Sequence, residues 1–323
     1  MSRFVSNEDI TRLLNGDRRI AARLITLLEE GNPTAKEAMK KIYPHTGKTI
    51  IIGITGGAGA GKSTLIDKLI EHIRLMNKRV GVVVVDPTSP FSGGAFLGDR
   101  MRMQRHTMDD GIYIRSMASR GYMGGIARAT SDTARVLEAM GMDYVLIETL
   151  GTGQDEVDII HLVQTCLMVV TPSSGDEIQA LKAGTMEIGH IFAINKSDLD
   201  GSMQFLRGLE SALSLKCDDG GSWRPRIVST VATDGKGIEE LVDAILEHQK
   251  HIRKTDNIDE VLLQRIEHEL GLIFKDELEK IIFSGIKGTG KKKQYIQDIR
   301  DGKADPYSVV DDILNTYIKK NVQ

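Results

Sequence analysis

An apolar run passes directly into a glycine-rich loop between residues 51 and 64, where the chain reads Ile51-Ile52-Gly53-Ile54-Thr55-Gly56-Gly57-Ala58-Gly59-Ala60-Gly61-Lys62-Ser63-Thr64. The first five residues have the pattern of a buried strand, and a helical pattern begins directly after the loop. Residues 56–63 fit the spacing G-x-x-x-x-G-K-[ST], in which glycines let successive backbone N–H groups point at phosphate oxygens. The helix N-terminus adds a favourable dipole for an anion. This order of strand, loop and helix predicts a phosphate-binding loop in an α/β fold.

The residues of this loop have different expected roles. Lys62 is expected to bridge the β- and γ-phosphates of a nucleotide, and the Ser63 hydroxyl is expected to ligate Mg²⁺. A chance glycine-rich turn would explain the glycines alone, but it would not explain the strand before them and the helix after them. The residues expected to contact the nucleotide here are Gly57, Ala58, Gly59, Ala60, Gly61, Lys62, Ser63, Thr64 and Leu65.

The middle of the chain alternates apolar strands with helical patterns. Several strands are apolar at successive positions, as in parallel strands that are covered on both faces. The alternation predicts an α/β fold of the P-loop NTPase kind, with a doubly wound, mostly parallel sheet and helices on both faces. The expected strands are 49–55, 80–85, 112–115, 144–148, 167–170, 191–195 and 226–228, and the expected helices are 62–76, 126–140, 203–215 and 237–248.

The two ends of the chain differ from its middle in having only helical patterns. We therefore expect a helical N-terminal extension at 1–45, a nucleotide-binding domain at 46–252 and a helical C-terminal segment at 253–323. In the extension, an apolar face is formed by Ile20, Leu24, Leu27 and Leu28, and residues 31–33 end that helix. In the C-terminal segment, apolar residues recur every three or four positions between 258 and 282. This stripe is expected to pack either on the main domain or on another copy of itself.

The sequence Asn195-Lys196-Ser197-Asp198 follows one of the expected strands directly. An Asp198 carboxylate can accept two hydrogen bonds from guanine, a donor pair that adenine lacks, while the Lys196 stem can lie over the purine and the Asn195 amide can brace the loop. The alternative is a polar turn in which Asp198 caps a helix. The position at a strand end of an open α/β sheet favours guanine recognition. A second base-contacting loop is expected at Ser229, Thr230 and Val231.

Two further strands end in a carboxylate, one at Asp86 and one at Glu148. In a chain with a phosphate-binding loop, such acids are candidate Mg²⁺ ligands, directly or through water, and with Lys62 they are the candidate catalytic residues. Asp99 is a weaker metal candidate. The alternative is that each acid is a helix cap or a solvated loop residue. The glycine-rich residues 151–156 could respond to the presence of a γ-phosphate.

Composition excludes several other classes of protein. The 323 residues carry 42 Lys and Arg against 45 Asp and Glu, a net charge of −3, and only 5% are aromatic, so neither nucleic acid nor a membrane surface is an expected partner. Two cysteines cannot make a disulfide framework or a cysteine-rich zinc site. No apolar run reaches the length of a membrane span, and the N-terminus lacks a signal-peptide pattern, so a cytoplasmic location is expected. His248 and His251, near an expected helix end, are expected to be solvated.

Several longer motifs resemble those of the MeaB/ArgK family, the methylmalonyl-CoA mutase-associated GTPases, and the resemblance covers nearly the whole chain. Departures are small: Leu150 and Thr152 stand where relatives often have Val, Asp155 where they have Ser, and Ser197 where Ala is frequent. None of these changes need alter phosphate or base chemistry. Besides residues 55–64 and 195–198, the matching stretches are 16–19, 86–100 (which begins Asp-Pro-Thr-Ser-Pro), 119–121, 124–125, 148–154 and 175–179.

The resemblance implies a specific function. Members of this family are chaperones for adenosylcobalamin-dependent acyl-CoA mutases such as methylmalonyl-CoA mutase, and they couple hydrolysis of GTP to GDP and phosphate to cofactor loading and protection of the mutase. The family works as homodimers through its helical tail, which agrees with the apolar stripe described above. Its nucleotide-dependent switch segments correspond here to about 86–105, 148–158 and 174–184.

Two other functions use the same loop. One is a nickel-insertion GTPase for another metalloenzyme, which should carry a Cys/His metal site. The other is a kinase-type P-loop protein, in line with older naming of relatives after amino-acid transport, which would transfer phosphate to an acceptor and need not prefer guanine. The sequence offers no convincing Cys/His site.

Overall fold

The computed structural model describes residues 5–86, 104–106, 108–118, 125–149, 159–172, 188–214, 223–254, 263–264, 266–275, 277–278 and 291–317. The expected site residue Asp99 and most of the three switch segments therefore lie outside the described residues. The chain divides into two compact units, Met1–Arg265 and Ile266–Gln323.

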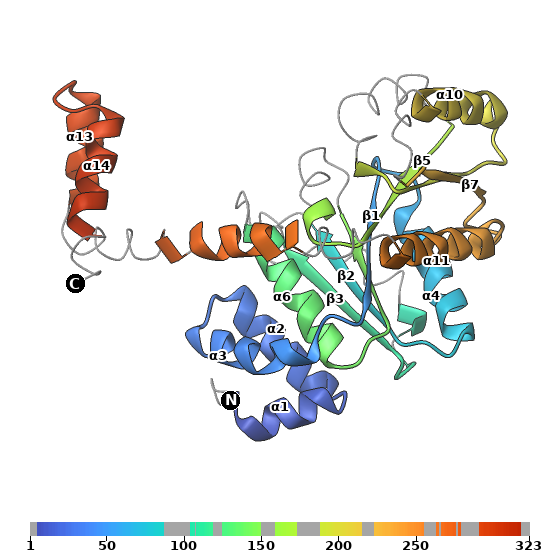
Figure 1. Cartoon of the computed structure of the whole chain (residues 1–323), viewed down its shortest axis with the longest axis horizontal. Helices are drawn as coiled ribbons and strands as arrows, with labels where there is room; N and C mark the ends of the chain where they lie inside the picture. The colour runs from blue at the N-terminus through green and yellow to red at the C-terminus, as the bar shows by residue number, and fades with distance from the viewer. Residues whose placement is uncertain are drawn as a thin grey trace. The chain divides into compact units, whose positions relative to one another are not determined.

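A parallel sheet of seven strands forms the centre of the first unit (Figure 1), in the order β3-β2-β4-β1-β5-β6-β7. Each neighbouring pair runs parallel. A strand is present at each of the seven expected places, so the predicted fold class is confirmed. The strands are β1 (Ile50–Thr55), β2 (Val80–Asp86), β3 (Ile112–Ala118), β4 (Tyr144–Glu148), β5 (Thr165–Val170), β6 (Ile191–Asn195) and β7 (Arg226–Thr230).

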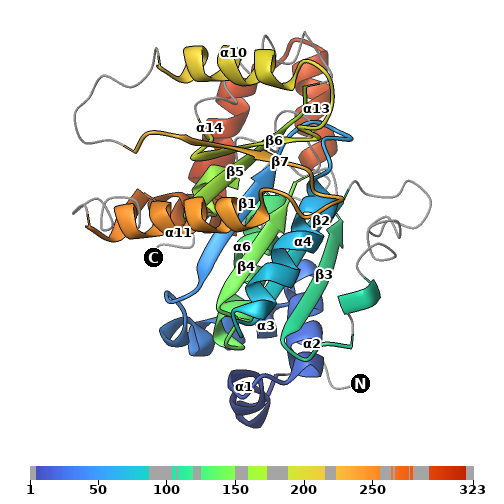
Figure 2. The same cartoon turned by 90° about the vertical axis from the view of Figure 1, so that its right-hand side faces the viewer.

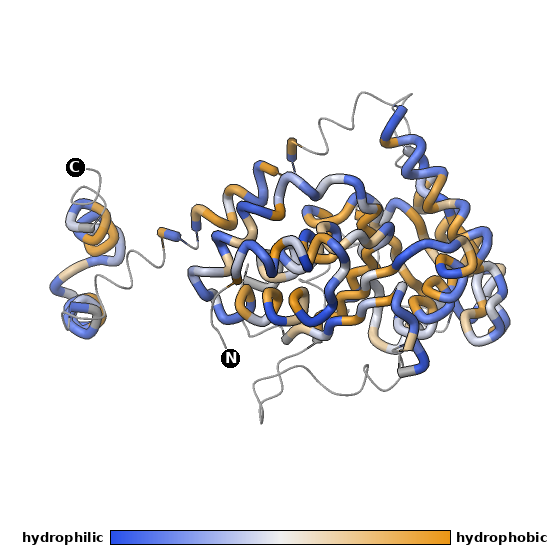
Figure 3. Tube along the Cα trace, turned by 90° about the horizontal axis from the view of Figure 1, so that it is seen from below, coloured by the Kyte–Doolittle hydropathy of each residue, from blue (hydrophilic) through white to orange (hydrophobic). Residues whose placement is uncertain are grey.

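Helices cover both faces of the sheet, which explains why the central strands are apolar at successive positions. On one face lie α4 (Lys62–Leu75) and α11 (Ile238–Lys254), whose apolar side chains share a core with alternate residues of the strands. Figure 2 shows α4 lying across this face. On the other face lie α6 (Gly125–Ala139) and α10 (Ser202–Ser214). Hydrophobic positions accordingly gather inside the unit (Figure 3).

The N-terminal extension forms α1 (Asn7–Leu14), α2 (Arg18–Glu29) and α3 (Pro33–Ile42), which is followed by the short η1 (Tyr43–His45). Helices α2 and α3 pack on α6 and extend its apolar core outward from the sheet (Figure 1). The helix starts follow from capping, because Asp17 Oδ1 accepts hydrogen bonds from the N–H groups of Arg19 and Ile20. Asn32 caps α3 in the same way, and Pro33 occupies its first turn. The helix stop predicted at 31–33 is confirmed.

In the second unit, α13 (Lys291–Arg300) is joined by a short connection to α14 (Pro306–Tyr317). The Tyr295 hydroxyl donates to Asp312 Oδ2 at 2.5 Å and links the two helices. Asp305 caps α14 by accepting hydrogen bonds from the N–H groups of Tyr307 and Ser308. Several apolar side chains of this unit are exposed, namely Leu270, Phe274, Ile296, Tyr307, Val310 and Leu314. Within the described ranges, no helix has the length and apolar composition needed to cross a membrane.

Candidate functional site

The glycine-rich loop leaves the C-terminal end of β1, the strand between β4 and β5, and runs into α4. Gly56 and Gly61 have φ values of 139° and 92°, in the region that favours glycine. A Cβ atom at Gly56 would lie 2.0 Å from the carbonyl oxygen of Val169, and one at Gly61 would lie 2.3 Å from Asn195 Nδ2. The loop is therefore pressed against the ends of β5 and β6, and only glycine fits at these two positions.

Lys62 lies in the first turn of α4 and is 8% exposed. Its Nζ donates hydrogen bonds to the carbonyl oxygens of Gly56 at 2.7 Å and Gly57 at 3.1 Å. The ammonium group is thus held against the backbone at the start of the loop. An ammonium in this position is suited to neutralise the charge of phosphate oxygens that the loop N–H groups bind.

The side chains of Ser63 and Glu148 meet beside the loop, where Ser63 Oγ donates to Glu148 Oε1 at 2.8 Å. Glu148 ends β4 and is 5% exposed, and its Cα pairs with Ile54 of β1. Hydroxyl and carboxylate oxygens are the ligands that Mg²⁺ prefers. Asp86 is the last residue of β2. Val84, two residues before it, pairs with Glu148, so the backbone of Asp86 lies at the same end of the sheet as Glu148. The side chain of Asp86 is outside the described part.

Thr149 fixes the chain where it leaves this edge. Its N–H donates to the carbonyl oxygen of Ile54, and its hydroxyl donates to Thr55 Oγ1 at 2.9 Å. Thr149 is 6% exposed, and Thr55 is fully buried. Because the residue after Glu148 is tied twice to β1, the predicted switch segment leaves from a fixed point beside the phosphate-binding loop.

Asn195 joins three segments through one buried amide. Its Nδ2 donates to the carbonyl oxygen of Ala60 at 2.8 Å, and its Oδ1 accepts from the N–H of Ala232 at 3.1 Å and the hydroxyl of Thr230 at 3.3 Å. The amide therefore holds the phosphate-binding loop, the end of β6 and the loop after β7 together. The part of Ala232 was not predicted from the sequence, because Ala232 binds Asn195 through its backbone N–H and no side-chain pattern indicates such a contact.

Lys196 and Asp198 stand beside this amide at the surface. Lys196 has a φ of 57°, unusual for a residue other than glycine, and its Nζ donates to the carbonyl oxygen of Gly59 at 3.0 Å. Its side chain thus extends over the phosphate-binding loop. Asp198 is exposed, and α10 begins only at Ser202, so Asp198 does not occupy the capping position that the alternative interpretation requires. The carboxylate is accessible to a base.

The expected second base loop follows β7. The Ser229 side chain is exposed, whereas Thr230 and Val231 are buried. The Thr230 hydroxyl binds Asn195, and the carbonyl oxygen of Thr230 accepts from the N–H of Ser197. This loop therefore positions the residues of the 195–198 motif.

His248 departs from the sequence analysis. It is 2% exposed, its Nδ1 lies 2.8 Å from Thr165 Oγ1, and its ring lies 4.4 Å from that of His190, centroid to centroid. The prediction that His248 is solvated is therefore wrong, because α11 continues to Lys254 and carries this residue on its buried face. Burial lowers the pKa of His248 to about 3 and that of His190 to about 4. No set of three His, Cys, Asp or Glu side chains in the described part could hold a metal ion.

Comparison with known proteins finds several that are similar to this chain. A family model described as methylmalonyl-CoA mutase-associated GTPase MeaB matches residues 21–287. A Pyrococcus abyssi protein named as a GTPase is 47% identical over 314 residues, which are 97% of this chain and 97% of that protein. A mouse protein named methylmalonic aciduria type A homolog, mitochondrial, is 33% identical over 256 residues, 74% of this chain and 62% of its own length. The crystal structure of a LAO/AO transport system kinase has the same fold, with a TM-score of 0.70, 24% identity and 96% coverage of each chain.

Proposed function

Because the chain belongs to the family of methylmalonyl-CoA mutase-associated GTPases and is thus a GTP hydrolase, we propose that it is a chaperone for an adenosylcobalamin-dependent acyl-CoA mutase. In this proposal, hydrolysis of GTP to GDP and phosphate is coupled to loading of the cobalamin cofactor and to protection of the mutase. The observation that carries the proposal is the match of the family model over residues 21–287. The name of the mouse relative, which refers to methylmalonic aciduria, supports the same client.

The proposed phosphate site uses the loop from Gly57 to Leu65. Backbone N–H groups of the loop and the Lys62 ammonium would hold the phosphates and stabilise the charge that develops on them during hydrolysis. The position of Lys62 Nζ against Gly56 and Gly57 supports this role. The family name implies guanine-nucleotide binding, and the exposed carboxylate of Asp198 would select guanine, with Lys196 over the base and Asn195 as the brace.

The residues present fit a magnesium ion. Ser63 Oγ and Glu148 Oε1 lie 2.8 Å apart at the edge of the loop, and both are oxygen ligands of the kind that Mg²⁺ uses. We propose Ser63, Asp86 and Glu148 as its direct or water-mediated ligands, with Asp99 as a further candidate. When bound, Mg²⁺ would neutralise charge on the phosphate oxygens. In this role, Glu148 and Asp86 would contribute to catalysis by holding the ion beside the phosphates.

Regulation of the reaction would involve segments 86–105, 148–158 and 174–184. We propose slow hydrolysis by the isolated protein and faster hydrolysis with a mutase that reorders these segments. The anchored Thr149 supports a fixed starting point for the second of them. The exposed apolar side chains of the C-terminal unit support a homodimer formed through residues 253–323. In this proposal, residues 1–45 are a helical extension and residues 46–252 are the GTPase domain. A cytoplasmic location completes the proposal.

The test is a capture experiment from native extract with two nucleotide states. The protein is loaded either with GDP or with a non-hydrolysable GTP analogue, and the bound proteins are identified by mass spectrometry. Capture of an acyl-CoA mutase in an amount that depends on the nucleotide is expected. Capture of a hydrogenase or urease maturation factor, or of a permease, would overturn the chaperone proposal and leave the GTPase activity standing.

A nucleotide panel separates the GTPase from a kinase-type protein. Release of phosphate from GTP without a phosphorylated acceptor is expected, with little turnover of ATP. The Asp198→Asn variant should retain the fold and lose the preference for guanine, which connects the result of the panel to the proposed base contact.

A further inference from the structure

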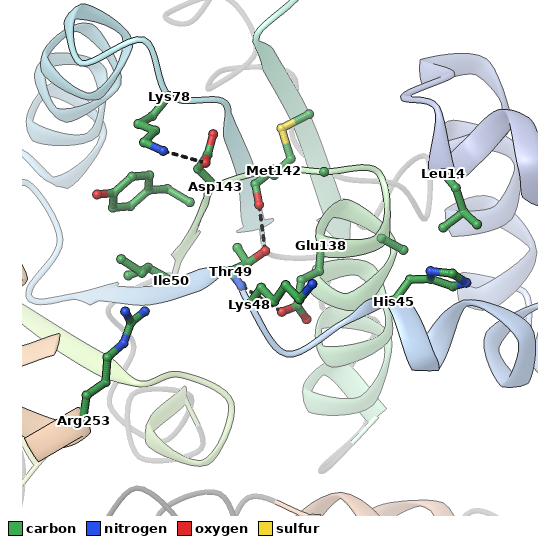
Figure 4. A pocket seen from close by; sticks show the side chains of 13 residues that line it. Leu14, His45, Lys48, Thr49, Ile50, Lys78, Glu138, Met142, Asp143 and Arg253 are labelled. Atoms are coloured by element: carbon green, nitrogen blue, oxygen red, sulfur yellow. Dashed lines mark hydrogen bonds and ion pairs between the residues drawn. The ribbon is translucent and has the colours of Figure 1, made fainter. Parts of the chain in front are cut away.

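A cavity lies at the end of the sheet opposite the phosphate-binding loop. It has a volume of about 460 Å³ and opens where β1 and β4 begin (Figure 4). Tyr144 and Glu148 are the first and last residues of β4, so this cavity and the candidate nucleotide site are separated by the length of that strand, roughly 13 Å. The cavity is lined by Leu14, His45, Lys48, Thr49, Ile50, Lys78, Glu138, Ala139, Gly141, Met142, Asp143, Tyr144 and Arg253.

Tyr144 is a buried residue that lines this cavity and carries a polar hydroxyl group. The residue is 6% exposed, and its Cα pairs with Ile50 on one side and Val80 on the other, which fixes the backbone that carries the ring. Within the described ranges its hydroxyl makes no hydrogen bond. Burial first, and then the charge of Asp143, raise the pKa of Tyr144, while Lys78 and Arg253 act against this rise. The phenol is therefore protonated at neutral pH and is a hydrogen-bond donor with two cations near it.

The cavity is lined by three cations, Lys48, Lys78 and Arg253, and by two carboxylates, Glu138 and Asp143, and this excess of positive charge favours an anion. Both carboxylates of the cavity are held by the backbone. Glu138 Oε1 accepts hydrogen bonds from the N–H groups of Gly47 and Thr49, and Asp143 Oδ2 accepts one from the N–H of Arg79. Lys78 Nζ contacts Asp143 Oδ1 at 3.2 Å. Arg253 forms no ion pair with any residue in the described part of the chain, and Figure 4 shows its guanidinium near Ile50. Its planar donors remain available for an oxyanion.

We propose that this cavity binds a small organic anion whose carboxylate or phosphate group is held by Arg253, Lys78 and the Tyr144 hydroxyl. Ile50 and Leu14 also line the cavity, and their apolar side chains suit an apolar part of the same molecule. Carboxylate and phosphate share the chemistry of several acceptor oxygens and a negative charge. Arg253 supplies a fork of donors, Lys78 supplies a point charge, and Tyr144 sets the orientation of one oxygen.

The test measures binding of defined probes to the full chain by titration calorimetry. The protein is first saturated with GDP and Mg²⁺, so that the phosphate-binding loop is filled and cannot bind the probe. Phenyl phosphate and benzoate carry the two possible anionic groups on the same ring, and benzyl alcohol is their neutral counterpart. We expect one or both anions to bind in the millimolar range or tighter and benzyl alcohol not to bind.

Variants connect this binding to the cavity. Arg253→Gln should weaken the anion by about tenfold or more, because a charge-assisted hydrogen bond is lost, and Tyr144→Phe should weaken it several-fold while keeping the ring in place. Arg207→Gln, at an exposed position of α10, is the matched control and should bind as the parent chain does. Affinity for GDP should be the same in all three.

Each outcome bears on the proposal. Binding of phenyl phosphate alone, or of benzoate alone, supports it and identifies the anionic group. It is overturned by the absence of heat up to roughly 10 mM of either anion, by equal binding of benzyl alcohol, or by variants of Arg253 and Tyr144 that bind as tightly as Arg207→Gln.

Discussion

The hydroxyl of Ser63 and the carboxylate of Glu148 lie 2.8 Å apart, which joins the first turn of α4 to the last residue of β4. The two residues are far apart in the sequence, and they meet because β4 is hydrogen-bonded to β1, the strand that leads into the loop. A metal ion that binds here would be held by side chains from two rigid elements. This relationship makes the magnesium proposal testable by substitution of either residue.

Glu148→Gln removes the charge and keeps the shape of the side chain. We expect the Mg²⁺ concentration that supports half-maximal GTP hydrolysis to rise about 10- to 100-fold, as for other changes to metal-site carboxylates. The measurement is a Mg²⁺ titration of GTPase activity at saturating GTP. Ser63→Thr keeps the hydroxyl and is the control, with an expected change of less than a few-fold. An unchanged Mg²⁺ requirement in Glu148→Gln would remove Glu148 from the metal site.

Gly59 and Gly61 offer a matched pair for backbone strain in the loop. Both have positive φ values, 78° and 92°, but a Cβ at Gly59 meets nothing within 4 Å, whereas one at Gly61 lies 2.3 Å from Asn195 Nδ2. Gly59→Ala is expected to cost about 1–2 kcal/mol of unfolding free energy from strain alone. Gly61→Ala should cost more and should also weaken GTP binding, because the Asn195 amide must move away from the loop.

Urea unfolding of the nucleotide-free protein measures both costs. In the double variant Gly61→Ala, Asn195→Ala, the backbone strain at residue 61 should remain. Only part of the steric cost in unfolding free energy should be relieved, because the second substitution also removes the Asn195 hydrogen bonds to Ala60 and Ala232. Equal stability of the two alanine variants would contradict the close contact between Gly61 and Asn195.

Asp198→Asn tests the base assignment directly. The carboxylate can accept two hydrogen bonds from guanine, and an amide can accept on only one of its two atoms. We expect the preference for GTP over ATP to fall about tenfold or more, measured as the ratio of dissociation constants. Asp200→Asn, two residues further along and also exposed, is the control and should keep the preference. Retained guanine selectivity in Asp198→Asn would place base recognition elsewhere.

The elements of the fold were predictable because their signals are local. Apolar runs such as Val82–Val85 indicate strands that are covered on both faces, and α4 begins at Lys62 as the loop pattern predicts. The order of the strands could not be derived, since β1 lies between β4 and β5 through contacts that no local pattern records. The candidate site shows the same division. Residue types made Lys62 and Asn195 candidates, but the Ala232 N–H that donates to Asn195 was not predictable.

The burial of His248 shows why a short polar pattern can mislead. The sequence places it near an expected helix end, and two histidines three residues apart resemble a solvated surface pair. In the structure α11 continues beyond it, and the rings of Trp223 and His190 lie 4.7 Å and 4.4 Å from its ring. These partners come from segments that precede β6 and β7, so the burial depends on tertiary contacts that the sequence around His248 does not contain.

These buried histidines predict a loss of stability in acid. The unfolded chain takes up a proton on each near pH 6.5, whereas the folded pKa values are about 3 for His248 and about 4 for His190, so acidification stabilises the unfolded state. The unfolding free energy should be fully maintained above pH 6.5. It should fall below that pH by up to about 1.4 kcal/mol per pH unit for each histidine, until the folded pKa is reached. Urea unfolding between pH 7 and pH 4.5 measures this slope. His248→Gln should make this slope smaller. His45→Gln, at an exposed residue, is the control and should leave the slope unchanged. A slope that His248→Gln does not change would assign the acid sensitivity to other groups.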